Sequence, residues 1–431
     1  MKILVLTNLY PPHHAGTFDN HCQTVTESLR MRGHTIGILT SSHGLLNEQV
    51  DRETHRRLQL NGVYGHPLVT SYPKMKDMEL HNNSALMEAI EEFKPDVVHV
   101  FSLAGISKSL VFTLYNSKLP VVYDVFDHWL SANVREDPWL RFWNAPSLPI
   151  LAHSSRKALE MSGERGRLDT SAPTRMRRGY ERLPGLFGEK VEPNTIGGFR
   201  LGRIYFCSRA LKQLTEQMGF CVAHGEVIYP GITAAYIGDL KPPGAPMAKF
   251  LIVGRLDKHS GVMTALKALK LARKAGLKIN LSIYGRGDTG YVADLRSFVV
   301  SNQLPVEFLT VSNAASDMAG VYKQHDVLLH TPEWAEPFPF TPLEAMGCGL
   351  PVIGAISGGA EELLRHGENS LTYPPGNAEQ LAARIQELLI SPALRCQMAE
   401  TAQSEVLAKF NDATVIDQVE NFLTNSQSQT T

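Results

Sequence analysis

Two glutamates, Glu336 and Glu344, bracket seven uncharged residues, PFPFTPL, that are rich in proline. The apolar run DVLLH at 326–330 precedes them, and TPLE predicts a helix start with Thr341 as N-cap, Pro342 at the first helical position and Glu344 in a capping box. Such a helix directs unpaired N–H groups at the carboxyl edge of a parallel sheet, where ligands bind. We expect a diphosphate at the helix and sugar hydroxyls at a carboxylate; the alternative is that Glu344 only satisfies its own helix.

A second group of candidates follows the apolar run KFLIVG at 249–254. Arg255 comes directly after this run, and Lys258 lies three positions later. A guanidinium is always charged and can bind two phosphate oxygens at once, so Arg255 is a candidate ligand for a diphosphate; the alternative is a surface arginine. Near the N-terminus, Gly16 ends the loop PPHHAG, and a glycine there allows close approach of the backbone to a ligand.

Two parallel sheets are needed to position these candidates. Apolar runs rich in Ile, Val and Leu alternate with helical patterns, which is typical of buried parallel strands. In the first half the runs are KILVLTNL, HTIGILTSS, PDVVHVFS and LPVVYDVF. After the proline-containing segment LKPPGAPMAK the alternation restarts with KFLIVG, KINLSIYG, VEFLTV, DVLLH, PVIGA and SLTYP. The sequence therefore predicts an α/β chain with two Rossmann-like domains in tandem.

The domain boundaries follow from this alternation. We expect an N-terminal domain over residues 1–240, with an irregular insertion at about 130–200, and a C-terminal domain over 241–405. The last segment, 406–431, contains the amphipathic sequence FNDATVIDQVENFL. It is predicted to form a helix that packs back on the N-terminal domain.

The irregular region combines aromatic and basic residues. Trp129, Trp139 and Trp143 lie at its start, and eight Lys/Arg against four Asp/Glu follow over 156–182. One interpretation is an acceptor-binding or membrane-facing surface. The other is a solvated loop with three core tryptophans.

The composition of the 431 residues excludes several classes of protein. Forty-two basic and forty-three acidic residues leave a net charge of −1, which argues against a nucleic-acid partner. The five cysteines are scattered without CxxC spacing and are expected to be reduced thiols. The N-terminal apolar run is too short for a signal peptide, and no run of about 18 apolar residues occurs. We expect a cytoplasmic protein, with peripheral membrane contact as the second expectation.

The pattern Glu336-x7-Glu344, followed by EAMGCGLPVIG, resembles the signature of retaining GT-B glycosyltransferases of family 4. This resemblance implies two Rossmann-like domains whose parallel sheets face each other across a cleft, and a nucleotide-diphosphate-sugar donor of UDP or GDP type. It implies that Glu344 binds the ribose hydroxyls and Glu336 the transferred sugar. Donor contacts are further implied at Gly16, Arg255, Lys258, Phe338, Phe340 and Thr341, with backbone amides of 338–341 facing the sugar and phosphates.

The chain departs from the family at three places. Ser260 stands where the family has a lysine before a glycine, and Pro339 stands where it has a glycine. The family's functional histidine in the first domain corresponds to Phe126. Because residues i and i+2 of an extended chain point the same way, His128 is predicted to act from a shifted position, with Asp127 beside it. The alternative is a histidine that packs against a tryptophan.

The absence of an Asp-x-Asp pair predicts a site without metal, and the resemblance implies no cofactor other than the donor substrate. A carboxylate nucleophile for double displacement is not evident, so we expect same-face substitution in which the leaving phosphate takes the acceptor proton.

The acceptor is expected to be a glycan or glycolipid of cell-surface assembly, or a small molecule such as a sugar phosphate. The alternatives are a sugar-nucleotide epimerase and a degenerate, non-catalytic binding protein. A nicotinamide-dependent dehydrogenase is disfavoured because neither domain opens with G-x-G-x-x-G.

Overall fold

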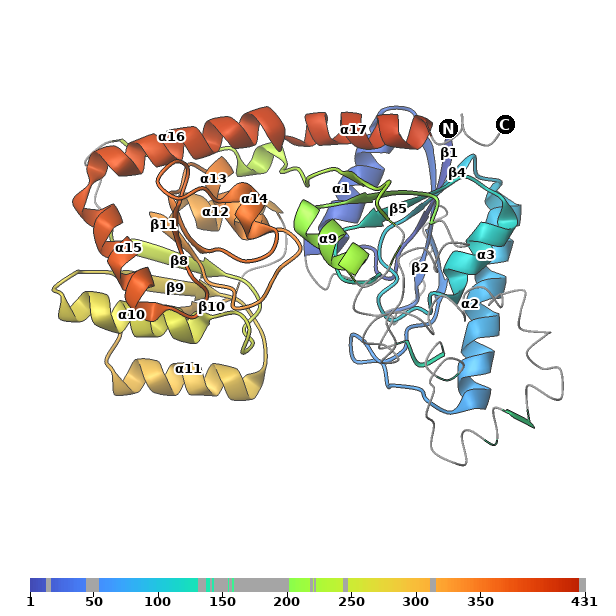
Figure 1. Cartoon of the computed structure of the whole chain (residues 1–431), viewed down its shortest axis with the longest axis horizontal. Coiled ribbons are helices and arrows are strands. Elements are labelled where there is room, and N and C mark those ends of the chain that lie inside the picture. The colour runs from blue at the N-terminus through green and yellow to red at the C-terminus, as the bar shows by residue number, and fades with distance from the viewer. Residues whose placement is uncertain are drawn as a thin grey trace. The chain divides into compact units, whose positions relative to one another are not determined.

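The computed structural model describes residues 1–12, 17–43, 54–130, 201–217, 222–242, 247–310 and 315–425, with a few single positions between 137 and 220. The chain divides into two compact units (Figure 1). Unit 1 contains Met1–Ile228 together with Ile416–Thr431, and unit 2 contains Tyr229–Val415. The predicted boundary at 240–241 lies close after this division, and most of the predicted insertion at 130–200 lies outside the described residues.

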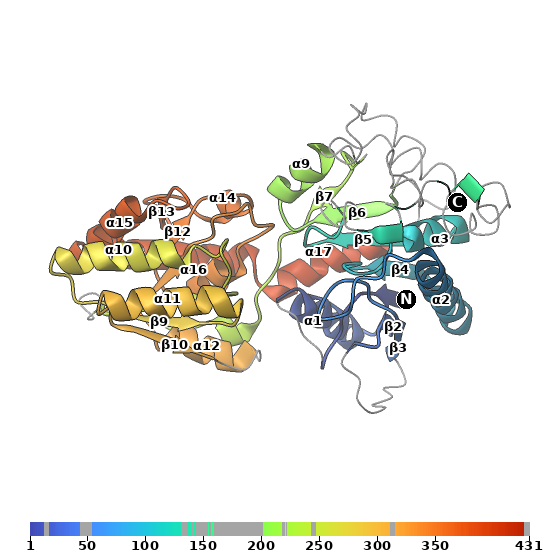
Figure 2. The same ribbon diagram turned by 90° about the horizontal axis from the view of Figure 1, so that it is seen from below.

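Unit 1 is built on a parallel sheet of seven strands in the order β3-β2-β1-β4-β5-β6-β7. Its strands are β1 Lys2–Leu6, β2 Thr35–Ser41, β3 Thr54–Leu58, β4 Val97–Val100, β5 Val121–Val125, β6 Arg203–Phe206 and β7 Glu226–Val227. Its helices are α1 Thr17–Met31, α2 Tyr72–Phe93, α3 Ser109–Ser117 and α9 Arg209–Gln217. In Figure 1, α1 lies on one face of the sheet and α2 and α3 lie on the other. Figure 2 shows α9 beside β6 and β7.

Unit 2 is built on a second parallel sheet, of six strands in the order β10-β9-β8-β11-β12-β13. Its strands are β8 Lys249–Val253, β9 Asn280–Tyr284, β10 Val306–Leu309, β11 Val327–His330, β12 Val352–Ala355 and β13 Leu371–Tyr373. Its helices are η2 Ala234–Tyr236, α10 Val262–Lys274, α11 Thr289–Ser301, α12 Ala315–Lys323, α13 Phe340–Gly347, α14 Ala360–Leu363, α15 Ala378–Ile390 and α16 Pro392–Lys409. In Figure 1, α10 and α11 cover one face, and α12 and α13 the other.

The predicted apolar runs become the central strands because both faces of each sheet are covered. β1, β2, β4 and β5 are almost entirely buried, as are β8, β11, β12 and β13. Strands β3, β6 and β7 were not predicted. The sequence of β3, THRRL, carries a histidine and two arginines and lies at the edge of the sheet, so it lacks the apolar run of a central strand.

The last helix, α17 Asp412–Thr424, reaches unit 1. Glu420 pairs with Arg32 at 2.5 Å and with His34 at 2.8 Å, both just after α1. The ring of Phe422 packs edge-on against Tyr205 at 5.3 Å between centroids, and the Arg203 guanidinium lies 4.1 Å from the same ring. These contacts attach the end of the chain both to the residues that follow α1 and to β6.

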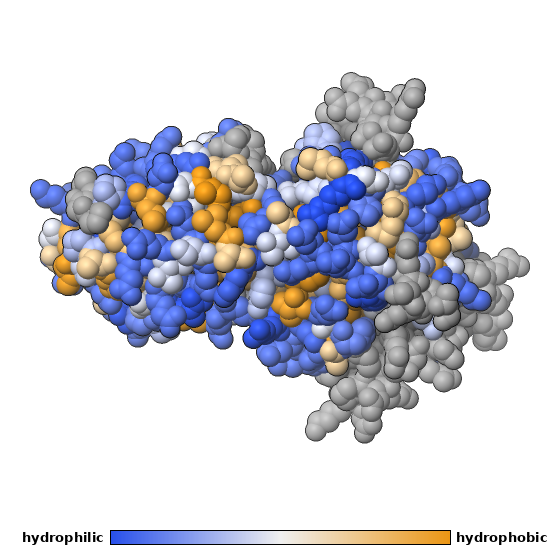
Figure 3. Space-filling view, turned by 90° about the horizontal axis from the view of Figure 1, so that it is seen from above, coloured by the Kyte–Doolittle hydropathy of each residue, from blue (hydrophilic) through white to orange (hydrophobic). Residues whose placement is uncertain are grey.

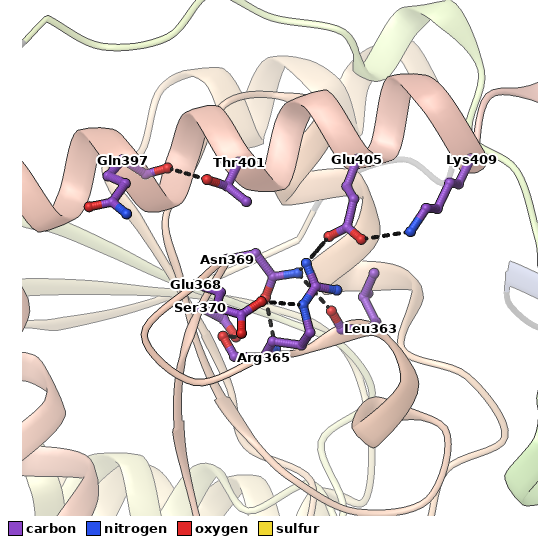
Figure 4. A network of polar contacts seen from close by, with 9 residues as sticks. All are labelled: Leu363, Arg365, Glu368, Asn369, Ser370, Gln397, Thr401, Glu405 and Lys409. Atoms are coloured by element: carbon purple, nitrogen blue, oxygen red, sulfur yellow. Dashed lines mark hydrogen bonds and ion pairs between the residues drawn. The ribbon is translucent and has the colours of Figure 1, made fainter.

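A polar network attaches the 364–370 loop to α16 within unit 2 (Figure 4). The Glu405 carboxylate accepts from Arg365 at 2.5 Å, from the Asn369 amide at 3.0 Å and from Lys409 at 3.0 Å. Asn369, which is 1% exposed, also donates to the carbonyl of Leu363 at 2.9 Å. One carboxylate on the helix therefore holds the loop that precedes β13.

Most of the face shown in Figure 3 is hydrophilic, with apolar residues in scattered groups. Within the described part of the chain, we find no helix with the length and apolar character needed to cross a membrane.

Candidate functional site

In unit 2 the strand order reverses between β8 and β11, which are hydrogen-bonded neighbours although they are far apart in sequence. Ligands of open α/β sheets bind at such a switch point, outside the carboxyl ends of the strands. The two segments that leave this point are 254–261, after β8, and 331–340, after β11. Most of the predicted donor-binding residues lie on these two segments or in the first turns of α13.

The two segments are locked together by backbone contacts. The Thr331 hydroxyl donates to the carbonyl of Ser260 at 2.8 Å, and the Glu333 N–H donates to the carbonyl of His259 at 2.8 Å. Gly261 has φ 66°, and a Cβ there would overlap the carbonyl oxygen of Thr331. Only glycine accommodates both this backbone conformation and this approach. The floor of the switch point is therefore a rigid contact between two loops.

Glu336 is held by a histidine that the sequence reasoning missed. His330, the last residue of β11, pairs through Nε2 with the Glu336 carboxylate, and the side chains are 8% and 14% exposed. The other ring nitrogen of His330 lies 3.3 Å from the Thr341 hydroxyl. This single imidazole therefore connects two predicted donor-binding residues. The sequence did contain a signal for this residue: DVLLH predicts a buried strand, and its last residue, His330, lies at the edge of the sheet where a ligand would bind.

The glycine turn at 357–359 fixes the backbone of Glu336. The N–H of Gly359 donates to the carbonyl of Glu336 at 2.8 Å, and Glu336 forms an isolated bridge with Gly358. Gly358 has φ 60°, and side chains at either glycine would meet the backbone of 335–338. This glycine turn thus positions the backbone of Glu336.

The predicted capping box is wrong. Helix α13 begins at Phe340 with Pro339 as N-cap, and no side chain caps it. The hydroxyl of Thr341 points to His330 instead, and Glu344 bonds to two tyrosines. The helix begins earlier because proline, which cannot donate a backbone hydrogen bond, is tolerated at the start of a helix. The first turn then presents the N–H groups of Phe340 and Thr341, since Pro342 has none.

Glu344 accepts hydrogen bonds from the hydroxyls of Tyr322, at 2.7 Å, and Tyr236. Burial raises the pKa of Glu344 to about 7, and the two tyrosine hydroxyls act in the opposite direction. Both tyrosines, on α12 and η2, escaped the sequence reasoning because neither is near Glu344 in sequence. The carboxyl therefore changes charge near neutral pH, and it is oriented before any ligand arrives.

The two predicted cations are exposed. The Arg255 side chain is 79% exposed and its Nε lies 2.9 Å from Asp257. Lys258 is also exposed in the turn that follows. Ser260, at the family's lysine position, donates its hydroxyl to the carbonyl of Asp257 at 2.6 Å and thereby closes this turn. The segment after β8 thus carries two cations on a turn that is closed by Asp257 and Ser260.

The two predicted phenylalanines differ in their surroundings. Phe338 is 5% exposed, and its ring packs against Tyr229 at 5.7 Å and Phe410 at 6.1 Å. Phe340 meets the Phe338 ring edge-on at 6.2 Å and is partly exposed. The side chain of Phe338 is therefore part of the core, and only its backbone is available to a ligand.

In unit 1, Asp127 and His128 lie in a turn that follows β5. The Asp127 carboxylate accepts from the N–H of Trp129 at 2.6 Å and from the hydroxyl of Ser102 at 3.1 Å. Burial raises the pKa of Asp127 to about 6, against the effect of these two hydrogen bonds. His128 is partly buried beside it. Asp127 thus organises the turn that carries His128.

A buried polar network lies behind this turn. Asp124, on β5, accepts from His21 at 3.0 Å and from the hydroxyl of Tyr205 at 2.9 Å. His99 lies 2.9 Å from the Tyr205 oxygen, and burial lowers the pKa of His99 to about 4. His99 is therefore neutral and donates to Tyr205. His21, on α1, also stacks on Phe126 at 3.7 Å, so a histidine from another element adjoins the position where the family carries one.

Some predicted residues cannot be assessed. Gly16, Trp143 and almost all of the basic stretch 156–182 lie outside the described residues. Trp129 and Trp139 are each 1% exposed and belong to the core of unit 1. No group of His, Cys, Asp and Glu that could hold a metal ion is found among the positions the structure describes.

Comparisons with known proteins agree with this arrangement. Residues 244–405 match the family described as Glycosyl transferases group 1. A glycogen synthase of Mycobacterium tuberculosis is 28% identical over 213 residues, which are 48% of this chain and 50% of that protein. A D-inositol 3-phosphate glycosyltransferase of Rhodococcus erythropolis is 29% identical over 170 residues, 37% of each chain. The chain thus spans half the length, or less, of these relatives.

Solved structures extend the likeness to the whole chain at the level of the fold. A sucrose-phosphate synthase of Thermosynechococcus elongatus has a TM-score of 0.68 at 17% identity and covers 98% of both chains. The HepE protein of Anabaena, in complex with UDP, has a TM-score of 0.67 at 18% identity and covers 99% of this chain and 100% of that one. The chain therefore has the GT-B fold of two Rossmann-like units, and its residues 244–405 match the Glycosyl transferases group 1 family.

Proposed function

We propose that the protein is a retaining glycosyltransferase of family 4 that moves a sugar from a nucleotide-diphosphate sugar to an acceptor hydroxyl. The observation that carries this proposal is the convergence of Glu336, Thr341 and Glu344 at the switch point of the unit 2 sheet, where ligands of open α/β sheets bind. The family match covers the same unit. Solved relatives of the same fold contain UDP and UDP-glucose.

The donor would bind on unit 2 in a defined order of contacts. Glu344, oriented by Tyr322 and Tyr236, would accept from the ribose hydroxyls. The start of α13 at Phe340 and Thr341 would face the diphosphate, which the positive end of the helix dipole would favour. Arg255 and Lys258 would turn toward the phosphates and supply positive charge. Glu336 would accept from a hydroxyl of the sugar while His330 holds it in place.

The transfer would proceed by same-face substitution. The bond between the anomeric carbon and the leaving phosphate oxygen breaks, and the acceptor oxygen forms the new bond from the same face. The acceptor proton passes to the leaving phosphate, so charge and atoms balance without a further reactant. No metal or cofactor is needed in this scheme, because the helix N-terminus and Arg255 would carry the diphosphate charge.

Unit 1 would receive the acceptor, a glycan, glycolipid or small molecule, in a cytoplasmic protein that contacts a membrane only at its surface. His128 is proposed to act on the transferred sugar, and Asp127 to fix the turn that carries it. These roles follow from the resemblance and from the position of the turn at the carboxyl end of β5.

Nucleotide binding tests the proposal. Thermal unfolding is measured with UDP, GDP and ADP, and a ligand at 100 times its Kd should add roughly 2.7 kcal/mol of stability. We expect one base to stabilise the wild type, Glu344→Ala and Glu344→Gln to lose most of this response, and Glu400→Ala on α16 to keep it. If no nucleotide stabilises the wild type, the proposal is wrong.

A non-catalytic binding protein of the same fold is the second candidate. The observation that favours it is the turn after β8, where Ser260 replaces a cation and Arg255 is paired with Asp257. Slow hydrolysis of a nucleotide sugar in the absence of acceptor distinguishes the two. A transferase releases free sugar from the donor that it binds, whereas a binding protein returns the donor intact.

A further inference from the structure

Unit 1 contains a cavity of about 240 Å³ that no predicted role accounts for. Its walls come from the first turns of α2, the segment after β3 and the segment that joins β4 to α3. The last two leave the carboxyl ends of their strands, and β4 adjoins the switch point between β1 and β4 in the strand order. The cavity therefore lies at the edge of the sheet where a ligand of unit 1 is expected.

Three ionisable side chains in the cavity wall are almost fully buried. Glu79 is 5% exposed, Lys108 2% and Asp137 5%. The Ser109 hydroxyl donates to Glu79, and the Lys108 N–H donates to Asp137 at 2.9 Å. Burial, and next the charge of Asp137, raise the pKa of Glu79 to about 8. The wall of the cavity therefore combines two carboxyl groups with one ammonium group.

Part of the wall is apolar. Met75, Met78 and Trp139 line it, and Trp139 is 1% exposed. Gly105, with φ 77°, lets the segment after β4 approach so closely that a Cβ would overlap the side chain of Val63. This tight packing fixes the mouth of the cavity without help from a ligand.

Two asparagines hold the loop that closes the cavity. Asn82, on α2, exchanges hydrogen bonds with the backbone of Gln59 at 2.8 and 3.0 Å. Asn61 exchanges hydrogen bonds with the backbone of Val69 at 2.7 and 3.1 Å. The amide groups are used for structure, so ligand recognition falls to Glu79, Lys108 and the apolar wall.

The cavity shares a segment with the turn predicted to act in transfer. Lys108, in the segment after β4, lines the cavity, and its positive charge lowers the pKa of both Glu79 and Asp127. Ser102, in the same segment after β4, donates to Asp127 at 3.1 Å. The segment after β4 therefore contributes both to the cavity wall and to the hydrogen bonding of the turn that carries His128.

We propose that this cavity binds one neutral, hydroxyl-rich ring, a sugar or a cyclitol, as part of the acceptor. The proposal rests on the transferase function proposed above. A volume below the roughly 300 Å³ at which ligand pockets usually begin suits a single ring. The carboxyls and Lys108 offer hydrogen bonds to hydroxyls, and the methionines and Trp139 face the apolar side of a ring. An anionic ring would meet the carboxyls of Glu79 and Asp137.

Saturation-transfer NMR on the full chain tests this site with methyl α-glucoside, methyl α-mannoside and myo-inositol, and with glucose 6-phosphate as the anionic probe. Met78→Trp fills the cavity without removing a polar group. Met87→Trp, on the exposed side of the same helix, is the matched control. We expect at least one neutral ring to bind, Met78→Trp and Glu79→Gln to weaken it by about tenfold or more, and Met87→Trp to leave it unchanged.

The inference is overturned if no neutral ring binds, if Met78→Trp binds as the wild type does, or if glucose 6-phosphate binds better than every neutral ring. Circular dichroism and the nucleotide-induced thermal shift on the same samples report whether each variant is folded. Failure of ring binding with nucleotide binding intact refutes the cavity assignment alone. Ring binding without any nucleotide response would refute the proposed transferase and leave the cavity assignment standing.

Discussion

At the scale of single residues, the donor site depends on side chains that are oriented by others. His330 holds Glu336, and two tyrosines hold Glu344, so neither carboxylate needs to be ordered when a ligand binds. Such preorganisation lowers the entropic cost of binding. The elevated pKa of Glu344 also makes its charge depend on pH in the neutral range.

The affinity for a nucleoside diphosphate is therefore expected to depend on pH through Glu344. Above the pKa of about 7 the carboxylate accepts two hydroxyl hydrogens, and below it the protonated group loses an acceptor. We expect affinity to fall as pH decreases below 7, by up to about tenfold per unit. Calorimetric titrations from pH 5.5 to 8.5 measure it. Glu344→Gln should bind the nucleoside diphosphate more weakly and lose this dependence on pH. An identical pH profile in wild type and variant would contradict the role of Glu344 in binding.

Gly261 is expected to be irreplaceable for both stability and binding. In Gly261→Ala, the strain of a left-handed residue, about 1–2 kcal/mol, is joined by overlap of the new Cβ with the Thr331 carbonyl. Gly276, at the other end of α10, also has positive φ but has open space around its Cβ position. Gly276→Ala therefore reports the backbone strain alone. Urea unfolding should show a clearly larger loss for Gly261→Ala, and equal losses would mean that the two loops separate easily.

At the scale of elements, the loops at the carboxyl edges are held by contacts with neighbouring elements. The 364–370 loop is the clearest case, because one carboxylate on α16 accepts hydrogen bonds from both Arg365 and Asn369 of this loop (Figure 4). Burial disfavours the charged form of Glu405, yet hydrogen bonds from Arg365, Lys409 and Asn369 lower its pKa overall. The network therefore stabilises the folded protein only while Glu405 is ionised.

Glu405→Ala, which removes this carboxylate, is expected to lower the free energy of unfolding by about 1–2 kcal/mol. The loss is modest because Arg365 is partly exposed, and only the contact with Asn369 is well shielded from water. Glu400→Ala, at an exposed position on the same helix, is the control. The folded pKa of Glu405 is lowered, so its stabilisation is present above about pH 4.3 and is lost as pH falls below that value. Urea unfolding at pH 7 and pH 3.5 measures both effects; a difference that persists in acid would exclude the ionic contribution.

At the scale of the whole molecule, the chain returns to unit 1 after it has formed the sheet of unit 2. Helix α16 belongs to unit 2, and the following α17 returns its last residues to unit 1. Val419 and Leu423 are fully buried and Phe422 is 5% exposed. The C-terminal segment thus completes the core of unit 1 after the whole of unit 2, Tyr229–Val415, has intervened in the sequence.

Loss of the Phe422 ring is expected to weaken unit 1 and leave unit 2 unchanged. Phe422→Ala removes contacts with Tyr205 and Arg203 and should cost about 3–5 kcal/mol. Hydrogen exchange read separately for each unit measures this, with faster exchange expected in β6 and α1 and no change in β9 or α10. Gln418→Ala, at an exposed position on the same helix, is the control. Equal changes in both units would show that they unfold as one.

The order of elements could be predicted from the sequence because buried parallel strands require continuous apolar runs, such as KILVL and KFLIV. Strands β3 and β7 were missed because they form the two edges of the first sheet, where burial on both faces is not required, and β7 is only two residues long. Strand β6 is buried, but its sequence RIYF is short and follows the irregular region, so no regular alternation marks it. The start of α13 was misplaced because two prolines offered two possible first turns, and only packing decided between them.

The sequence by itself determined an α/β chain of two Rossmann-like units and placed Glu336, Glu344 and Arg255 at the edge where a ligand would bind, because residues that follow buried parallel strands must emerge at that edge. The partners of these residues were decided by the tertiary structure alone. His330, Tyr322, Tyr236 and the walls of the cavity around Glu79 come from different elements, and their meeting depends on how helices pack across a sheet. No local pattern encodes such contacts, because the residues that form them are separated along the chain and are brought together only by the fold.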